Sequence, residues 1–136
     1  MQCSSHPTVT INTNEVLGER YPARRLLALI GDKWTPVVVY CLARRRRRFS
    51  DLHRSIPGIS KKMLIQVLRA LERDGLVNRT LYPVVPPRTE YELTREGKHL
   101  HKPIAALCRW AARNEKLLGM IERRREAARR GGTGEA

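Results

Sequence analysis

The chain has 136 residues, and its hydrophobic and charged contents of 41% and 29% are typical of a folded globular domain rather than a disordered segment. Its 27 lysines and arginines outnumber its 13 aspartates and glutamates, and the net charge of +14 predicts a polyanion, an anionic membrane or an acidic protein as partner. No apolar run has the length of a transmembrane helix and the first residues lack a signal-peptide pattern, so the sequence favours a cytoplasmic protein without a membrane partner.

Two helices are predicted near the start of the folded part, and after the arginine run Ser50 can cap a third, short helix. Pro22 begins a helical pattern that contains Leu26, and Gly31 ends it. Thr35 followed by Pro36 resembles a helix N-cap and a first-turn proline. The valine run that follows would also fit a buried strand, so periodicity alone leaves this segment open.

The segment ISKKMLIQVLRALERDGL predicts a helix over residues 60–74. Ser60 is a good N-cap, Ile59 and Leu64 can form a hydrophobic staple, and Gly75 can adopt the left-handed conformation that ends a helix. At 100° per residue, one face is apolar and consists of Leu64, Val67, Leu68 and Leu71. The opposite face carries Lys62, Gln66, Arg69 and Arg73, with Ile65 beside them.

Two strands and a last helix follow. VNRTLY and TEYEL alternate as strands, and the prolines of PVVPPR exclude a tight two-residue turn between them. Thr94 can cap the last helix, and Pro103 predicts a kink or a restart within it. The apolar seam of this helix needs a partner, for which a second copy of the chain is the natural choice; the seam consists of Leu100, Ile104, Leu107, Ala111, Leu118 and Ile121.

This order of elements predicts a mainly α fold with a small antiparallel β-sheet, the winged helix-turn-helix. In such a fold the helix over 60–74 enters the major groove of DNA, where each base pair shows a distinct pattern of donors and acceptors. The wing, residues 83–89, then reaches the adjacent groove or the backbone.

Several motifs in this order resemble the HxlR-type transcriptional regulators: LIGDKWT, RRFSDL, PGIS, LRALERDGLV, YPVVPPRTEYELT and LCRW. The resemblance covers roughly Tyr21 to Ala112. It implies a domain over 21–112 whose first and last helices form a dimer, sequence-specific DNA binding, and usually repression of nearby genes. It also favours a helix for the valine run. Residues 1–20 are then a flexible arm, 113–130 an extension of the last helix, and 131–136 a disordered tail.

The chain departs from this family pattern at three places. Tyr21 stands where many members carry a cysteine, which some of them use to sense thiol-reactive compounds, and this argues against such sensing here. Ile65 and Val67 replace common polar residues, so fewer side chains can read bases, although Ile65 can meet a thymine methyl group. Val84 replaces a frequent acidic residue and makes the wing less anionic.

The predicted DNA contacts follow from this placement. Gln66 can pair with adenine and Arg69 with guanine through two hydrogen bonds each. The full recognition-helix set is Ser60, Lys61, Lys62, Ile65, Gln66 and Arg69. Arg88 of the wing can enter a minor groove, or it can instead pair with Glu90. Phosphate contacts are predicted for Arg47, Arg48 and Arg73.

The arginine run over residues 44–48 has three readings: a phosphate contact, a solvated loop or a nuclear address. The last needs a flexible segment, whereas this run lies between a predicted buried helix and Phe49. The family pattern places Arg47 and Arg48 on a short strand that pairs with the wing sheet. Because alternate residues of a strand face opposite ways, we expect at most two or three of the five arginines to contact phosphate.

No metal site, cofactor or enzymatic activity is predicted. Cys3, Cys41 and Cys108 are far apart and form no CxxC pair, while His99 and His101 face different directions on a helix. Cys41 is expected in the core and Cys108 near the dimer seam, both as packing residues. A nucleophile with a matching base is missing from the sequence patterns, as is a glycine loop that binds phosphate.

The sequence as a whole predicts a homodimeric regulator, with repression favoured, bound to an inverted repeat with half-sites roughly 34 Å apart. Its partners are double-stranded DNA and a second copy of the chain, with a small-molecule effector left open, and it is nucleoid-associated when DNA-bound. The dimer interface is predicted to include Leu26, Leu107, Trp110 and Leu118. The alternative is a basic RNA- or ribosome-binding protein, but only 5% of the residues are aromatic, and RNA readers usually expose aromatic side chains.

Overall fold

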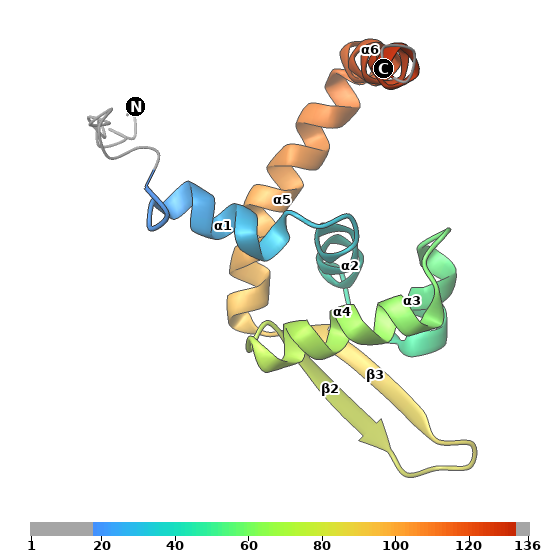
Figure 1. Ribbon diagram of the computed structural model, residues 1–136. Helices are drawn as coiled ribbons and strands as arrows, with labels where there is room; N and C mark the ends of the chain where they lie inside the picture. Colours follow the sequence, from blue (N-terminus) through green and yellow to red (C-terminus); the bar gives the residue numbers. More distant parts are fainter. Residues whose placement is uncertain (1–17, 133–136) are drawn as a thin grey trace, which may run out of the picture.

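The computed structural model describes residues 18–132 (Figure 1). The predicted N-terminal arm lies outside the described residues up to residue 17, and so do residues 133–136 of the predicted tail. The elements in chain order are α1 (Pro22–Ile30), α2 (Thr35–Leu42), β1 (Arg47–Arg48), α3 (Phe49–Ser55), α4 (Lys61–Arg73), β2 (Val77–Tyr82), β3 (Arg88–Leu93), α5 (Arg95–Arg113) and α6 (Glu115–Gly132). Among the described residues, no helix is both long and apolar enough to cross a membrane.

The sheet is antiparallel with strand order β1-β3-β2. Arg47 lies opposite Tyr91, and Tyr82 lies opposite Arg88 at the loop end of the β2–β3 hairpin. The two long strands therefore form a wing that extends away from the helices (Figure 1). The predicted mainly α fold with a small antiparallel sheet is confirmed, and the valine run is helical, as the family resemblance implied.

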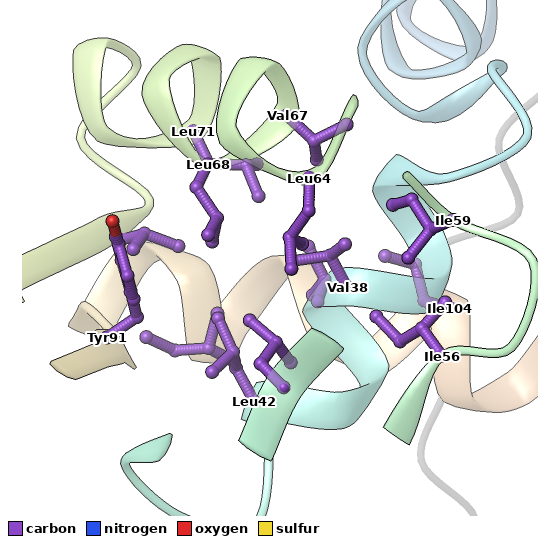
Figure 2. Packing of buried hydrophobic residues seen from close by; sticks show 14 of the residues in the cluster. Val38, Leu42, Ile56, Ile59, Leu64, Val67, Leu68, Leu71, Tyr91 and Ile104 are labelled. Atoms are coloured by element: carbon purple, nitrogen blue, oxygen red, sulfur yellow. The ribbon is translucent and has the colours of Figure 1, made fainter. Parts of the chain in front are cut away.

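One apolar core holds the helices and the sheet together. The inner face of α4 contributes Leu64 and Leu68, which point toward Val38 of α2 and Tyr91 of β3 (Figure 2). Val38 and Leu64 have no exposed surface. Full burial of a leucine side chain contributes about 1.5–3 kcal/mol, so this packing fixes the position of α4. The buried face of α4 is the one that the sequence predicts, namely Leu64, Val67, Leu68 and Leu71.

Both ends of α4 are formed as predicted. The Ser60 hydroxyl accepts a hydrogen bond from the Met63 N–H over 3.0 Å. At the other end, Gly75 has a φ of +76°, a conformation that costs glycine little. The Leu76 N–H then donates to the Leu71 carbonyl over 2.9 Å and closes the helix.

A close joint connects the end of α4 to the start of α5. The Thr94 hydroxyl donates to the Gly75 carbonyl over 2.6 Å and accepts from the Gly97 N–H over 3.1 Å. The Thr94 N–H also donates to the Leu76 carbonyl over 3.0 Å. A Cβ at position 97 would lie 2.1 Å from that same carbonyl oxygen, so only glycine fits.

Two predicted helix starts are wrong. Thr35 is the first residue of α2 rather than its cap. The Asp32 carboxylate caps this end instead, because it accepts hydrogen bonds from the Trp34 and Thr35 N–H groups over 3.2 and 3.1 Å. Ser50 lies inside α3, which already begins at Phe49 because β1 runs directly into it.

The last predicted helix is two helices, but the break is not where the sequence placed it. α5 continues through Pro103, whose missing N–H would have bonded the carbonyl of exposed His99, where water can replace it. The chain breaks at Asn114, whose side-chain amide donates to the Trp110 carbonyl over 2.8 Å. α6 then extends to Gly132, so it includes two residues that the sequence assigned to the tail.

Candidate nucleic-acid interface

The outer face of α4 carries exposed polar and basic side chains. Lys62, Gln66 and Arg69 all lie on it and are exposed. Lys61 and Arg73 are exposed as well, and Ile65 is half-buried. Within residues 18–132, the four cations of this face, Lys61, Lys62, Arg69 and Arg73, form no ion pair. Their charge is therefore available to an external anion.

A groove separates α4 from the wing. Its volume is about 1030 Å³, and Phe49, Leu68 and Tyr91 contribute apolar surface to its lining. Its arginines come from four different elements and are Arg48, Arg69, Arg73, Arg79 and Arg88. Of the sequence-predicted arginines, Arg48, Arg69, Arg73 and Arg88 are therefore brought to one concave surface.

The tip of the wing is apolar rather than basic. Val85 is fully exposed and Val84 is half exposed, and both lie in the loop 83–87 that joins β2 to β3. The peptide bond between Val85 and Pro86 is cis. The wing thus presents a hydrocarbon tip next to the arginines of the groove.

Arg88 lies at the base of this tip and is held along the sheet. Its Nε is 3.1 Å from Glu90 Oε2, and its guanidinium carbon lies 4.7 Å from the centre of the Tyr82 ring. The sequence left Arg88 with two alternatives, DNA contact or a pair with Glu90. In the structure the pair with Glu90 is formed, and the Arg88 side chain is still 37% exposed.

Two arginines of the run, Arg46 and Arg47, are engaged by partners within the chain. Arg46 donates to Glu92 over 2.8 Å and to the Tyr82 hydroxyl over 3.0 Å, and the hydrogen bond to Glu92 raises the pKa of the Arg46 guanidinium. Arg47 donates to the Cys41 carbonyl over 3.0 Å and to the Ser55 hydroxyl over 3.2 Å.

Arg48, in contrast, is exposed and lines the groove. Because the half-buried Arg47 is engaged within the chain, we retain only Arg48 of the predicted pair as a phosphate contact. The expectation of a short strand at Arg47 and Arg48 that pairs with the wing sheet is confirmed.

Sequence reasoning missed Arg79 of β2. This arginine lines the groove and forms an ion pair with Glu72 of α4, with 3.4 Å between Nε and Oε2. The signal was present in the strand alternation, since Arg79 is two residues after the buried Val77 and therefore shares its face. It thus connects the recognition surface of α4 to the wing.

The predicted dimer residues fall on two kinds of surface. Leu107 and Trp110 of α5 are 58% and 49% exposed. Leu26 is half-buried against the core of the same chain, and Leu118 of α6 is half-buried. Other exposed apolar side chains of the described helices extend this surface, namely Leu27 and Leu29 of α1 and Leu117, Met120 and Ile121 of α6.

The two described cysteines differ in their exposure. Cys41 is half-buried against the core, and burial raises the pKa of its thiol, while Cys108 on α5 is exposed. The His101 ring lies 5.8 Å from the Tyr40 ring. Over residues 18–132, no three His, Cys, Asp or Glu side chains are grouped as metal ligands. Cys3 lies outside the described residues.

Comparison with known proteins gives a consistent set of relatives. The family model described as HxlR-like helix-turn-helix matches residues 29–117. The HTH-type transcriptional regulator YtfH of Escherichia coli (strain K12) is 41% identical over 104 residues, which cover 76% of this chain and 82% of YtfH. The structure of the transcriptional regulator ytfH from Salmonella typhimurium matches with a TM-score of 0.66 at 41% identity, over 80% of this chain and 95% of that one. The redox regulator HypR in its reduced form matches with a TM-score of 0.69 at 35% identity, over 73% of this chain and 98% of that one.

Proposed function

The chain belongs to the HxlR-like helix-turn-helix family and is a DNA-binding transcriptional regulator, not an enzyme; from this premise we propose that it acts as a homodimeric repressor on an inverted-repeat operator. The observation that carries the proposal is the outer face of α4, whose four cations lack acidic partners in the described chain. That face enters the major groove, and the wing contacts the adjacent groove or backbone.

The roles of the α4 side chains follow from their chemistry. Gln66 reads adenine, Arg69 reads guanine, and Ile65 contacts a thymine methyl group. Ser60, Lys61, Lys62 and Arg73 lie along the same exposed side and contact phosphates or neighbouring bases. On the wing side, Arg48 contacts phosphate, because it is exposed at the edge of the groove.

The dimer is supported by apolar surface that a single chain leaves uncovered. Leu107 of α5 and Leu27 of α1 are both 58% exposed, and α6 has no buried residue. Extensive exposed apolar surface marks an interaction site on a protein. It lies toward the end of the molecule opposite the wing, so a second copy packed there leaves both α4 helices accessible (Figure 1).

Repression follows if the dimer occupies an operator that overlaps a promoter. A small-molecule effector remains the open partner. A thiol switch is not part of the proposal, because Tyr21 stands at the position where many members carry a cysteine, and burial raises the pKa of Cys41.

The test is a binding titration of the purified protein with its own upstream DNA, a random duplex and a structured RNA at one fixed salt concentration. We expect affinity for upstream DNA to exceed that for the random duplex at least about 1,000-fold. Equal affinity for all three would support the RNA- or ribosome-binding alternative and contradict operator specificity. A reporter gene behind the same upstream DNA should become more active when the regulator gene is deleted.

The dimer is tested by replacing Leu107 and Leu118 together by Asp. We expect a monomer by sedimentation, or an unfolded chain if the core also depends on the interface. Lys102→Asp is the matched control, because it places the same charge on α5 at an exposed position of another face. A dimer that survives the double substitution would refute the interface.

A further inference from the structure

The outer face of the wing sheet carries a closed network of opposite charges. Arg46 contacts Glu92 at 2.8 Å, the Tyr82 hydroxyl at 3.0 Å and Glu90 at 3.8 Å. Glu90 in turn contacts Arg88 at 3.1 Å, and Arg88 lies over the Tyr82 ring. Two arginines and two glutamates are therefore joined, and their formal charges cancel.

Glu90 occupies the centre of this network. It lies opposite Arg48 on β1 and opposite Thr80 on β2, so its side chain has a strand on either side. Its side chain is only 14% exposed, compared with 41% for Glu92. Both Arg46 and Arg88 reach it, which makes it the one carboxylate that two arginines share in this network.

Arg88 is also the cation best placed to leave the network. It is the first residue of β3, directly after the exposed apolar tip, and it lines the groove toward α4. Its Nε is enclosed and forms no hydrogen bond of good geometry, although it lies within ion-pair distance of Glu90. A DNA phosphate near the wing therefore competes with Glu90 for Arg88.

We propose that Glu90 is a positioning residue that holds Arg88 along the sheet and so limits the positive charge that the wing offers to DNA of any sequence. The inference rests on the proposed DNA-binding role of the wing. Phosphate contacts strengthen binding to every duplex alike, and discrimination comes from base contacts. A glutamate that neutralises a wing arginine therefore preserves the advantage of the operator over random DNA.

The experiment compares Glu90→Gln with the wild-type chain on a random duplex over a range of salt concentrations. Glutamine keeps the shape of the side chain but removes its charge. One additional phosphate contact steepens the slope of log K against log salt by about 0.9. Between 50 and 200 mM salt this corresponds to about a threefold larger loss of affinity. The ratio of operator to random affinity should fall in the same variant.

Two further variants separate this role from a general loss of charge. Glu92→Gln releases Arg46 from its nearest acid but leaves Glu90 beside Arg88, so the random-duplex slope should stay at the wild-type value. Arg88→Gln added to Glu90→Gln should remove the gained slope. The Arg88 Nε–H resonance, measured without DNA, should be slow to exchange with water in wild type and fast in Glu90→Gln.

An unchanged slope in Glu90→Gln, together with a released Arg88 resonance, would overturn the inference. So would an equal steepening in Glu92→Gln, since it would mean that total charge alone matters. Loss of operator preference in the wild-type chain is a separate result that contradicts the proposed function. The two failures are distinguishable because the slopes are measured on random DNA.

Discussion

The outer face of α4 and the outer face of the wing sheet are both rich in charged residues, but most of the charge on the second is compensated by ion pairs. On α4, Glu72 is the one acid near the outer face, and it pairs with Arg79 of β2. On the sheet, Arg46 and Arg88 meet Glu90 and Glu92 at ion-pair distance, and Arg48 at the sheet edge is left without an ion pair among the described residues. The cause is the strand repeat of two, which puts Glu90 and Glu92 on the same face. Net charge of +14 therefore says little about where the chain attracts DNA.

Both faces depend on the joint that fixes α4 and the sheet to α5, and breaking it should have the largest effect. Gly97→Ala brings a Cβ within 2.1 Å of the Leu76 carbonyl oxygen. We expect it to lower the free energy of unfolding by about 3 kcal/mol, at the upper end of overpacking costs. Urea denaturation measures this. Gly119→Ala in α6 is the control, since its nearest atom is a flexible arginine end at 3.5 Å, and it should stabilise the chain slightly.

The specificity assigned to α4 is tested by Gln66→Ala. We expect operator binding to weaken by about 1–3 kcal/mol, while binding to random DNA stays almost unchanged. Competition titrations with both duplexes at one salt concentration measure the two affinities. An equal loss of affinity for operator and random DNA would mean that Gln66 contacts the DNA backbone. The outer face of α4 would then not differ from the wing in specificity.

The position of the α4 side chains also depends on a stable first turn of the helix. Ser60→Ala removes the hydrogen bond from the Met63 N–H and should destabilise the chain by about 1 kcal/mol. Ser50→Ala is the matched control, because Ser50 lies within α3 and its change should leave the midpoint of unfolding nearly unchanged. A similar loss of stability in Ser60→Ala and Ser50→Ala would contradict the capping role of Ser60.

The smallest expected effect compares two neighbouring arginines of the same run. Arg48→Gln should make the salt slope on random DNA shallower by about 0.9, because Arg48 is exposed at the groove. Arg47→Gln should leave that slope unchanged and should lower stability, because it removes the bonds to Cys41 and Ser55. A shallower slope in Arg47→Gln and an unchanged slope in Arg48→Gln would show that DNA contacts Arg47 rather than Arg48.

The sequence predicted the elements that local signals specify fully. α4 has a capping serine, an apolar face at helical spacing and a terminal glycine, and each of these is a property of neighbouring residues. The strands β2 and β3 were predicted for the same reason, from alternation.

The remainder depended on contacts between distant segments, which local patterns do not encode. Ser50 fails as a cap because β1 pairs with β3 and leads straight into α3. The start of α2 is a local exception, because the carboxylate three residues before it forms the cap. The partners of Arg46 and Arg47 are set by tertiary packing, so no count of arginines reveals them. Pro103 gave a strong local signal, but the helix continued because the lost bond lies on an exposed side.

The Thr94 joint couples the orientation of α4 to that of α5. Because one threonine bonds the end of α4 and the start of α5 together, a rotation of α5 must carry α4 with it. In the proposed dimer, the angle of α5 then sets the distance between the two α4 helices. In such a dimer, a different angle of α5 would change the half-site spacing that the two α4 helices fit.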